Sequence, residues 1–170
     1  MLELMTGRFD QIAFITTDVD ETTALFRDRY GVPRFQVGEQ QMQASERGAP
    51  VPLSLKVAQV MLDGAELEII EDTGSGTDFF RRGLPDDGRF AHRLHHVQFQ
   101  IVGARELWDR HLAALVASHP PRLSGGTGED LRFAFTDETG VLGINFEYVW
   151  FSPAQKKKME SVPGVRSARG

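Results

Sequence analysis

The sequence predicts an α+β protein made of two tandem βαβββ modules, whose curved mixed sheets form a shared cleft. Residues 9–16 and 94–101 both alternate polar and apolar side chains with a period of two, which is typical of half-buried strands. A helical pattern follows each of them, and a hairpin that ends in a glutamate-bearing strand comes later. Two copies of a unit that cannot bury its face alone are expected to pack together.

In the first copy, the strand at 9–16 is followed by a helix at 21–30, with Asp18 or Asp20 as its N-cap. Gly31 and Pro33 are typical of the end of a helix. Residues 34–38 predict a short strand, and the polar residues 39–50 predict a loop or an irregular edge. The Asp63-Gly64 pair predicts a tight hairpin turn. It joins strands at 53–62 and 65–70.

In the second copy, the strand at 94–101 precedes an amphipathic helix at 104–117. The glycine-rich segment Ser124–Gly128 is expected to be a flexible loop. Two further strands are predicted at 131–136 and 144–150, joined by a turn.

These elements predict a single domain at 8–151, with module one at 8–72 and module two at 93–151. Residues 73–92, rich in Gly, Asp and Arg, are expected to link the modules. Residues 152–170 are expected to form a mobile tail.

The composition of the sequence argues against several classes of function. The chain has 170 residues, of which 41% are hydrophobic and 25% charged, as in a typical globular protein. The absence of cysteine excludes disulfides, thiolate metal sites and a cysteine nucleophile. A net charge of −5 gives no reason to expect nucleic-acid binding, and no apolar run is long enough to span a membrane. The N-terminus does not resemble a signal peptide, so the expected compartment is the cytoplasm.

The polar faces of the strands carry the candidate site. If helices cover the apolar faces, Gln11, His96 and the two glutamates of the hairpins all point into the cleft. Such a set is costly to bury unless a cation is present, and its donor types suit Zn, Mn, Co or Ni. The alternative is an ordinary wet sheet face that carries Glu66 and Glu68, with His96 as a hydrogen-bonded core residue. If a cation is bound, its candidate ligands are Gln11, Glu68, His96 and Glu147.

Four stretches resemble the vicinal oxygen chelate superfamily, which includes glyoxalase I, methylmalonyl-CoA epimerase, extradiol dioxygenases and bleomycin-resistance proteins. They are Phe9–Phe14, Ala65–Glu71, Leu94–Val97 and Gly143–Trp150. The resemblance implies a glyoxalase-like fold and metal ligands at the same four positions, on the first and last strands of each module. Gln11 departs from the commonest pattern, which has histidine there.

The resemblance also implies a chemistry. The four expected ligands include only one histidine, which disfavours an iron site and an extradiol-type dioxygenase. Two carboxylates beside a divalent ion (Zn, Ni, Co or Mn) suit a lyase or isomerase of the glyoxalase I or acyl-CoA epimerase type. In this reaction Glu147 and Glu68 would move a proton next to a carbonyl, and the metal would stabilise the enediolate.

Gln98 and Asn145 share these polar faces and are expected to contact a small carbonyl or thioester substrate. The family resemblance also implies a homodimer as a lesser expectation. The alternative function is that of a bleomycin-resistance-type protein, which sequesters a small molecule in the same cleft without catalysis.

Overall fold

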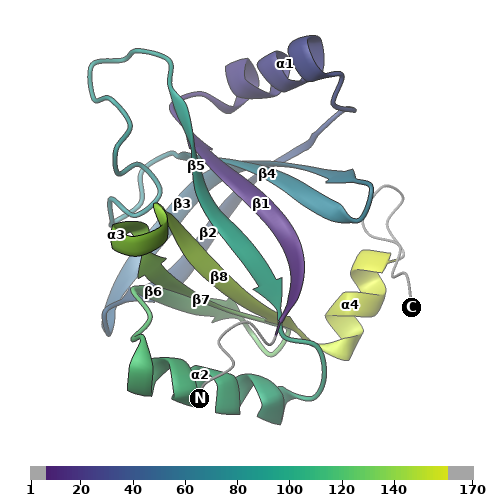
Figure 1. Cartoon of the computed structure of the whole chain (residues 1–170), viewed down its shortest axis with the longest axis vertical. Helices are drawn as coiled ribbons and strands as arrows, with labels where there is room; N and C mark the ends of the chain where they lie inside the picture. The colour runs from purple at the N-terminus through teal and green to yellow at the C-terminus, as the bar shows by residue number, and fades with distance from the viewer. Residues whose placement is uncertain (1–6, 161–170) are drawn as a thin grey trace.

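The computed structural model describes residues 7–160, and the strands in this range form one closed barrel in the order β1-β4-β3-β2-β6-β7-β8-β5 (Figure 1). Each half runs strand, helix, and three strands, so the predicted α+β fold of two βαβββ modules is confirmed. The elements are β1 (Arg8–Thr16), α1 (Val19–Tyr30), β2 (Gln36–Glu46), β3 (Ala49–Leu62), β4 (Ala65–Asp72), β5 (His92–Gln100), α2 (Arg105–Ser118), β6 (Leu123–Thr127), β7 (Leu131–Glu138), α3 (Thr139–Leu142), β8 (Ile144–Phe151) and α4 (Pro153–Glu160).

The two modules close the barrel by pairing with each other at two seams. Within the modules, β1 runs parallel to β4 and β5 runs parallel to β8. Between the modules, β1 pairs antiparallel with β5, and β2 pairs antiparallel with β6. The polar faces of both modules therefore meet inside one barrel, which is the shared cleft that the sequence predicts.

The long helices lie outside the barrel, on opposite sides of it (Figure 1). α1 begins where the Asp18 carboxylate accepts a hydrogen bond from the backbone of Glu21 at 2.9 Å, and it ends at Gly31 in the left-handed conformation. Its residue Val19 packs against β3 and β4. α2 packs Trp108 and Leu115 against the outer face of β5, β7 and β8. The helices cover the apolar faces, so the opposite faces are left for the site.

Two segments predicted as loops are strands. Residues 39–46 continue β2, because β3 pairs with this strand over eleven positions from Gln36 to Glu46. The glycine-rich segment predicted as a loop is β6, held between β2 and β7. At Gly125 a Cβ atom would lie 2.6 Å from the Phe133 ring, so the glycine permits close packing here and does not mark a flexible loop.

The segment between the modules is folded onto the barrel. It turns at 79–83 and buries Phe79 and Phe80 against Phe135. Beyond β8 the chain forms helix α4 where the composition predicted the beginning of a mobile tail; residues 161–170 lie outside the described residues.

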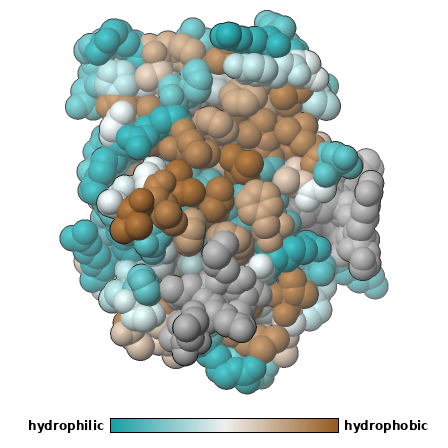
Figure 2. Space-filling view, in the orientation of Figure 1, coloured by the Kyte–Doolittle hydropathy of each residue, from teal (hydrophilic) through white to brown (hydrophobic). Residues whose placement is uncertain are grey.

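An apolar surface lies between α1 and α2 (Figure 2). Large hydrophobic side chains of β1 and β5 contribute to the exposed area, among them Phe9, Ile12 and Leu94. None of the helices within residues 7–160 combines the length and the apolar character needed to cross a bilayer.

Candidate functional site

The site is built on a pair of β-bulges that occupy equivalent positions in the two modules. Along the β1–β5 ladder, Gln11 faces Gln98 and Ala13 faces His96, but Asp10 and His95 have no opposite residue. Each bulge residue directly precedes a predicted ligand, Gln11 or His96. An extra residue bends the strand and re-aims side chains. The side chains of Asp10, Gln11, His95 and His96 are all buried.

His96 lies between the two predicted carboxylates. Its Nε2 atom is 3.2 Å from Oε2 of Glu147 and 3.8 Å from Oε2 of Glu68. The imidazole is 0% exposed, and within the described chain its Nε2 atom has no hydrogen-bond partner. The final strand of each module thus supplies one carboxylate to the same imidazole.

The neighbouring His95 determines which nitrogen of His96 carries hydrogen. Its Nε2 atom lies 3.1 Å from the carbonyl oxygen of Phe79, which can only accept, so this nitrogen is the donor. Burial, with His96 next, lowers the pKa of His95 well below its usual range, so the ring is neutral. Its Nδ1 atom therefore accepts from Nδ1 of His96 at 2.9 Å. The hydrogen between the two rings therefore belongs to Nδ1 of His96, and the Nε2 atom of His96 faces the carboxylates.

Amide side chains join the carboxylates into a continuous network. The Gln98 amide donates to Oε2 of Glu147 and to Oε1 of Gln11, both at 2.9 Å. The Gln11 amide donates in turn to Glu66. Gln59 then donates to Glu66 at 3.0 Å and to Glu68 at 2.9 Å. The amides orient three carboxylates without neutralising them.

The pKa of Glu68 is strongly perturbed. Burial, followed by the charges of Glu147 and Glu66, raises the pKa of Glu68 well above its ordinary value, although the bonds from Gln59 and Gln11 oppose this effect. A neutral Glu68 or a nearby cation would relieve the repulsion.

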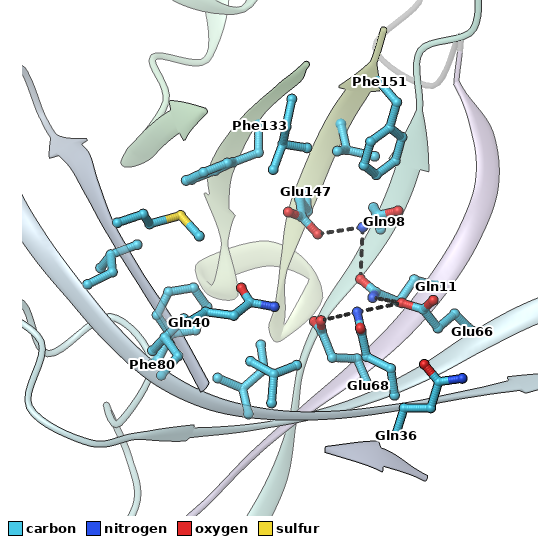
Figure 3. Close-up of a pocket in the computed structure, with 18 of the residues that line it drawn as sticks. Gln11, Gln36, Gln40, Glu66, Glu68, Phe80, Gln98, Phe133, Glu147 and Phe151 are labelled. Carbon is cyan, nitrogen blue, oxygen red and sulfur yellow. Dashed lines mark hydrogen bonds between the residues drawn. The ribbon is translucent and has the colours of Figure 1, made fainter. Parts of the chain in front are cut away.

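The network lines a cavity of about 440 Å³ inside the barrel, a volume suited to a small-molecule ligand. Figure 3 shows the carboxylates of Glu68 and Glu147 at the wall, with Gln11, Gln98 and Glu66 beside them. The remaining wall is mixed: it includes the rings of Phe80 and Phe133 and also Gln40, which lies beside Phe80 in Figure 3. The acidic groups are on one part of this cavity.

No protein-family model matches the sequence, and no curated protein matches it at a significant level. Solved structures do match the fold. Methylmalonyl-CoA epimerase from Mycobacterium tuberculosis has a TM-score of 0.52 and 13% identity, covering 92% of this chain and 97% of the epimerase. A Streptomyces coelicolor methylmalonyl-CoA epimerase variant in complex with 2-nitronate-propionyl-CoA has a TM-score of 0.50 and 18% identity, covering 86% and 98%.

A hypothetical protein from Bacillus halodurans has a TM-score of 0.55 and 10% identity, covering 86% of this chain and 96% of its own. The chain has the glyoxalase-like fold of the methylmalonyl-CoA epimerases. At these identities the likeness concerns the fold alone.

The residues on this glyoxalase-like fold fit a divalent cation by donor type. In the described part of the chain, no group of three or more His, Cys, Asp or Glu side chains forms a metal-binding cluster. Even so, Nε2 of His96 lies 3.2 Å and 3.8 Å from carboxylate oxygens of Glu147 and Glu68, and a cation or a proton between these atoms would stabilise the arrangement. His96, Glu68 and Glu147 would be the ligands. Gln11 could contribute its amide oxygen as well, which accepts one hydrogen bond from Gln98 and has a second lone pair.

The structure therefore brings together Gln11, Glu68, His96, Glu147 and Gln98, all of which the sequence predicts for the site. His96 contacts the carboxylates of Glu68 and Glu147 and does not itself line the cavity, whereas the other four residues do. Asn145 is different. Its amide donates to the backbone carbonyl of His95 at 3.1 Å, and it does not line the cavity.

Sequence reasoning missed three members of the site: His95, Glu66 and Gln59. Glu66 shares the alternation of Glu68, which could have indicated it. His95 lies on a bulge that strand periodicity does not reveal.

Proposed function

We propose that this protein is a metal-dependent lyase or isomerase that transfers a proton on the carbon next to a carbonyl, in the manner of glyoxalase I or an acyl-CoA epimerase. The supporting observation is the position of Glu147. Its carboxylate lies at the cavity wall, is oriented by Gln98, and is 3.2 Å from the imidazole of His96. A buried carboxylate of this kind is suited to general acid–base catalysis.

In the proposed reaction, Glu147 removes the proton from carbon and returns it. Gln98 holds the Glu147 oxygen through its amide hydrogen, so the other oxygen can face the substrate. Glu68 lies on the other side of His96 and is the second candidate for moving a proton. A bound divalent ion would act as a Lewis acid that takes up negative charge on the substrate oxygen.

Hydrogen exchange between substrate and solvent tests this proposal. The substrate panel contains methylglyoxal–thiol hemithioacetals and methyl-branched acyl-CoAs, incubated in D₂O with added Zn²⁺, Ni²⁺, Co²⁺ or Mn²⁺ and followed by NMR. We expect α-hydrogen exchange that Glu147→Gln slows by about 10²–10⁴-fold, the usual contribution of a general base. Glu39→Gln is the matched control, because Glu39 is exposed on β2 and does not line the cavity.

Other outcomes would change the proposal. Undiminished exchange in Glu147→Gln would show that Glu147 is not the base. Oxygen consumption would indicate a dioxygenase.

A second function, binding of a small molecule without catalysis, is favoured by one observation. The Gln11 amide is hydrogen-bonded to both Gln98 and Glu66, so the protein already provides this predicted ligand with partners of its own. Tight ligand binding without any exchange across the panel would support this function.

A further inference from the structure

Strand β2 contributes a row of side chains to the cavity that the carboxylate network does not include. Alternate residues of a strand share one face. Gln36, Gln40 and Met42 line the cavity, whereas Gln41 is exposed and does not line it. The inner face of β2 therefore adds two amide side chains to the cavity wall.

Gln40 differs from the other glutamines of the site in its partners. The amides of Gln11, Gln59 and Gln98 all hydrogen-bond within the network. By contrast, no group within residues 7–160 hydrogen-bonds the side-chain amide of Gln40. Figure 3 shows this amide pointing into the cavity from the side of Phe80. Gln40 is partly buried, so a ligand that fills this part of the cavity would enclose its amide.

The strand register separates Gln40 from the carboxylate network. Gln36, Gln59 and Glu68 lie side by side across β2, β3 and β4. Gln40 lies four residues further along β2, which corresponds to roughly 13 Å of strand. A ligand must therefore be elongated to contact both the carboxylates and the Gln40 amide.

The row of residues between these two polar positions is apolar. Gly38, Val57 and Ile70 lie side by side across the same three strands. Val57 and Ile70 line the cavity, and a Cβ atom on Gly38 would meet no other atom within 4 Å. Open space therefore lies beside this row. Along β2 the wall is polar at Gln36, apolar at Gly38 and its neighbours, and polar again at Gln40.

We infer that Gln40 is a specificity-determining residue, whose amide binds an uncharged hydrogen-bonding group of the substrate, such as a ketone or an amide. An apolar spacer on Val57 and Ile70 separates this group from the reacting carbon. The position of the reacting carbon, beside Glu68 and Glu147, rests on the proposed function. A plain alkyl chain would displace water from the Gln40 amide without replacing its hydrogen bonds, and this lowers affinity.

Binding of matched ligands tests this selectivity without depending on catalysis. The probes are 5-oxohexanoyl-CoA and 6-oxoheptanoyl-CoA, each paired with its ketone-free parent, hexanoyl-CoA or heptanoyl-CoA. Isothermal titration calorimetry with the full chain in EDTA is expected to show that at least one ketone binds about fivefold more tightly than its parent, because it gains one hydrogen bond. The chelator removes any contribution of a bound metal. Equal affinities within both pairs, tighter binding of the parents, or binding of none of the four ligands would overturn the proposal.

Substitutions of Gln40 then test the cause of the preference. Gln40→Met removes the donor at similar side-chain length, and Gln40→Glu at pH 8 keeps the shape but offers acceptors in place of the donor. In both variants the preference for the ketone is expected to fall below about twofold, while Gln40→Met changes binding of the parent by less than about twofold. Gln41→Met is the matched control on the same strand and should keep the full preference. A preference that persists in Gln40→Met, or an equal loss of affinity for both members of a pair, would show that Gln40 does not select the ketone.

The two proposals fail in different ways. A ketone preference that depends on Gln40, without hydrogen exchange in any substrate, would remove the proposed function and keep the role of Gln40. Hydrogen exchange that depends on Glu147, without any ketone preference, would keep the function and remove the role of Gln40.

Discussion

The Nδ1 atom of His95 lies 2.9 Å from the Nδ1 atom of His96, so the two adjacent imidazoles share one hydrogen. The carbonyl oxygen of Phe79, at the far side of His95, sets the direction of this bond. His95 is therefore a positioning residue, which keeps the Nε2 atom of His96 pointed at Glu68 and Glu147. Outer partners of this kind commonly tune the affinity of a metal ligand.

Replacing His95 is expected to weaken metal binding through the orientation of His96. In His95→Leu the His96 Nδ1 atom loses its acceptor, so Zn²⁺ affinity should fall by about 10–100-fold. His95→Asn restores an acceptor oxygen and should recover most of the affinity. Zinc titration against a competing chelator measures the affinities, and ¹⁵N NMR of the His96 ring reports which nitrogen carries hydrogen.

The controls for this prediction come from the same chain. His96→Ala removes the proposed ligand and should lower the affinity further than His95→Leu. His119→Leu lies at the exposed end of α2 and should have no effect. Zinc binding and a His96 hydrogen position that are both unchanged in His95→Leu would contradict the positioning role.

Glu68 should make the metal-free protein less stable as pH rises. Its pKa is raised in the folded state, mainly by burial, whereas the unfolded chain has an ordinary glutamate pKa of about 4.3. Below that value both states are protonated and stability is greatest. As pH increases, the unfolded state loses its proton first, so stability is lost until the pH passes the raised folded pKa.

Thermal unfolding in EDTA between pH 5 and pH 8 measures this effect. Glu68→Gln cannot ionise, so its melting temperature should exceed that of the wild type increasingly toward pH 8, by about 2–4 °C for each kcal/mol. Glu39→Gln should follow the wild type. If the melting temperatures of the wild type and Glu68→Gln change with pH in the same way, ionisation of Glu68 is not coupled to folding.

Arg122 should stabilise the folded protein near Phe79, whose carbonyl oxygen accepts the hydrogen bond from His95. Its guanidinium is buried and lies 3.3–3.4 Å from carboxylate oxygens of Glu46, Asp78 and Asp137, and 5.2 Å from the centre of the Phe79 ring. Arg122→Met leaves these carboxylates without their shared cation. We expect the free energy of unfolding to fall by about 1.5–3 kcal/mol. The loss is not larger because the three carboxylates are partly exposed and can be rehydrated.

Urea unfolding provides the measurement, and Arg82→Met the matched control. Arg82 pairs with the same Asp78, but both side chains are about half exposed, so its loss should cost less than about 1 kcal/mol. Similar losses in the two variants would mean that burial of Arg122 adds nothing to its ion pairs.

Local patterning in the sequence determined the repeat and the faces of the central strands. Side chains alternate along any strand whatever its neighbour, so the inward direction of Gln11, Glu68, His96 and Glu147 could be predicted before any partner strand was known. The turn at Asp63-Gly64 and the glycine at the end of α1 are local signals of the same kind.

Tertiary structure alone decided the features that depend on pairing between distant segments. β6 is a strand because β2 and β7 lie on either side of it, although its own residues resemble a loop. The bulge at His95 is a property of the register between β1 and β5, and it turns a second histidine inward. The hydrogen position on His96 depends further on Phe79, sixteen residues before His95. Strand register, β-bulges and the hydrogen bond between His95 and His96 depend on non-local contacts, so they cannot be predicted from strand periodicity.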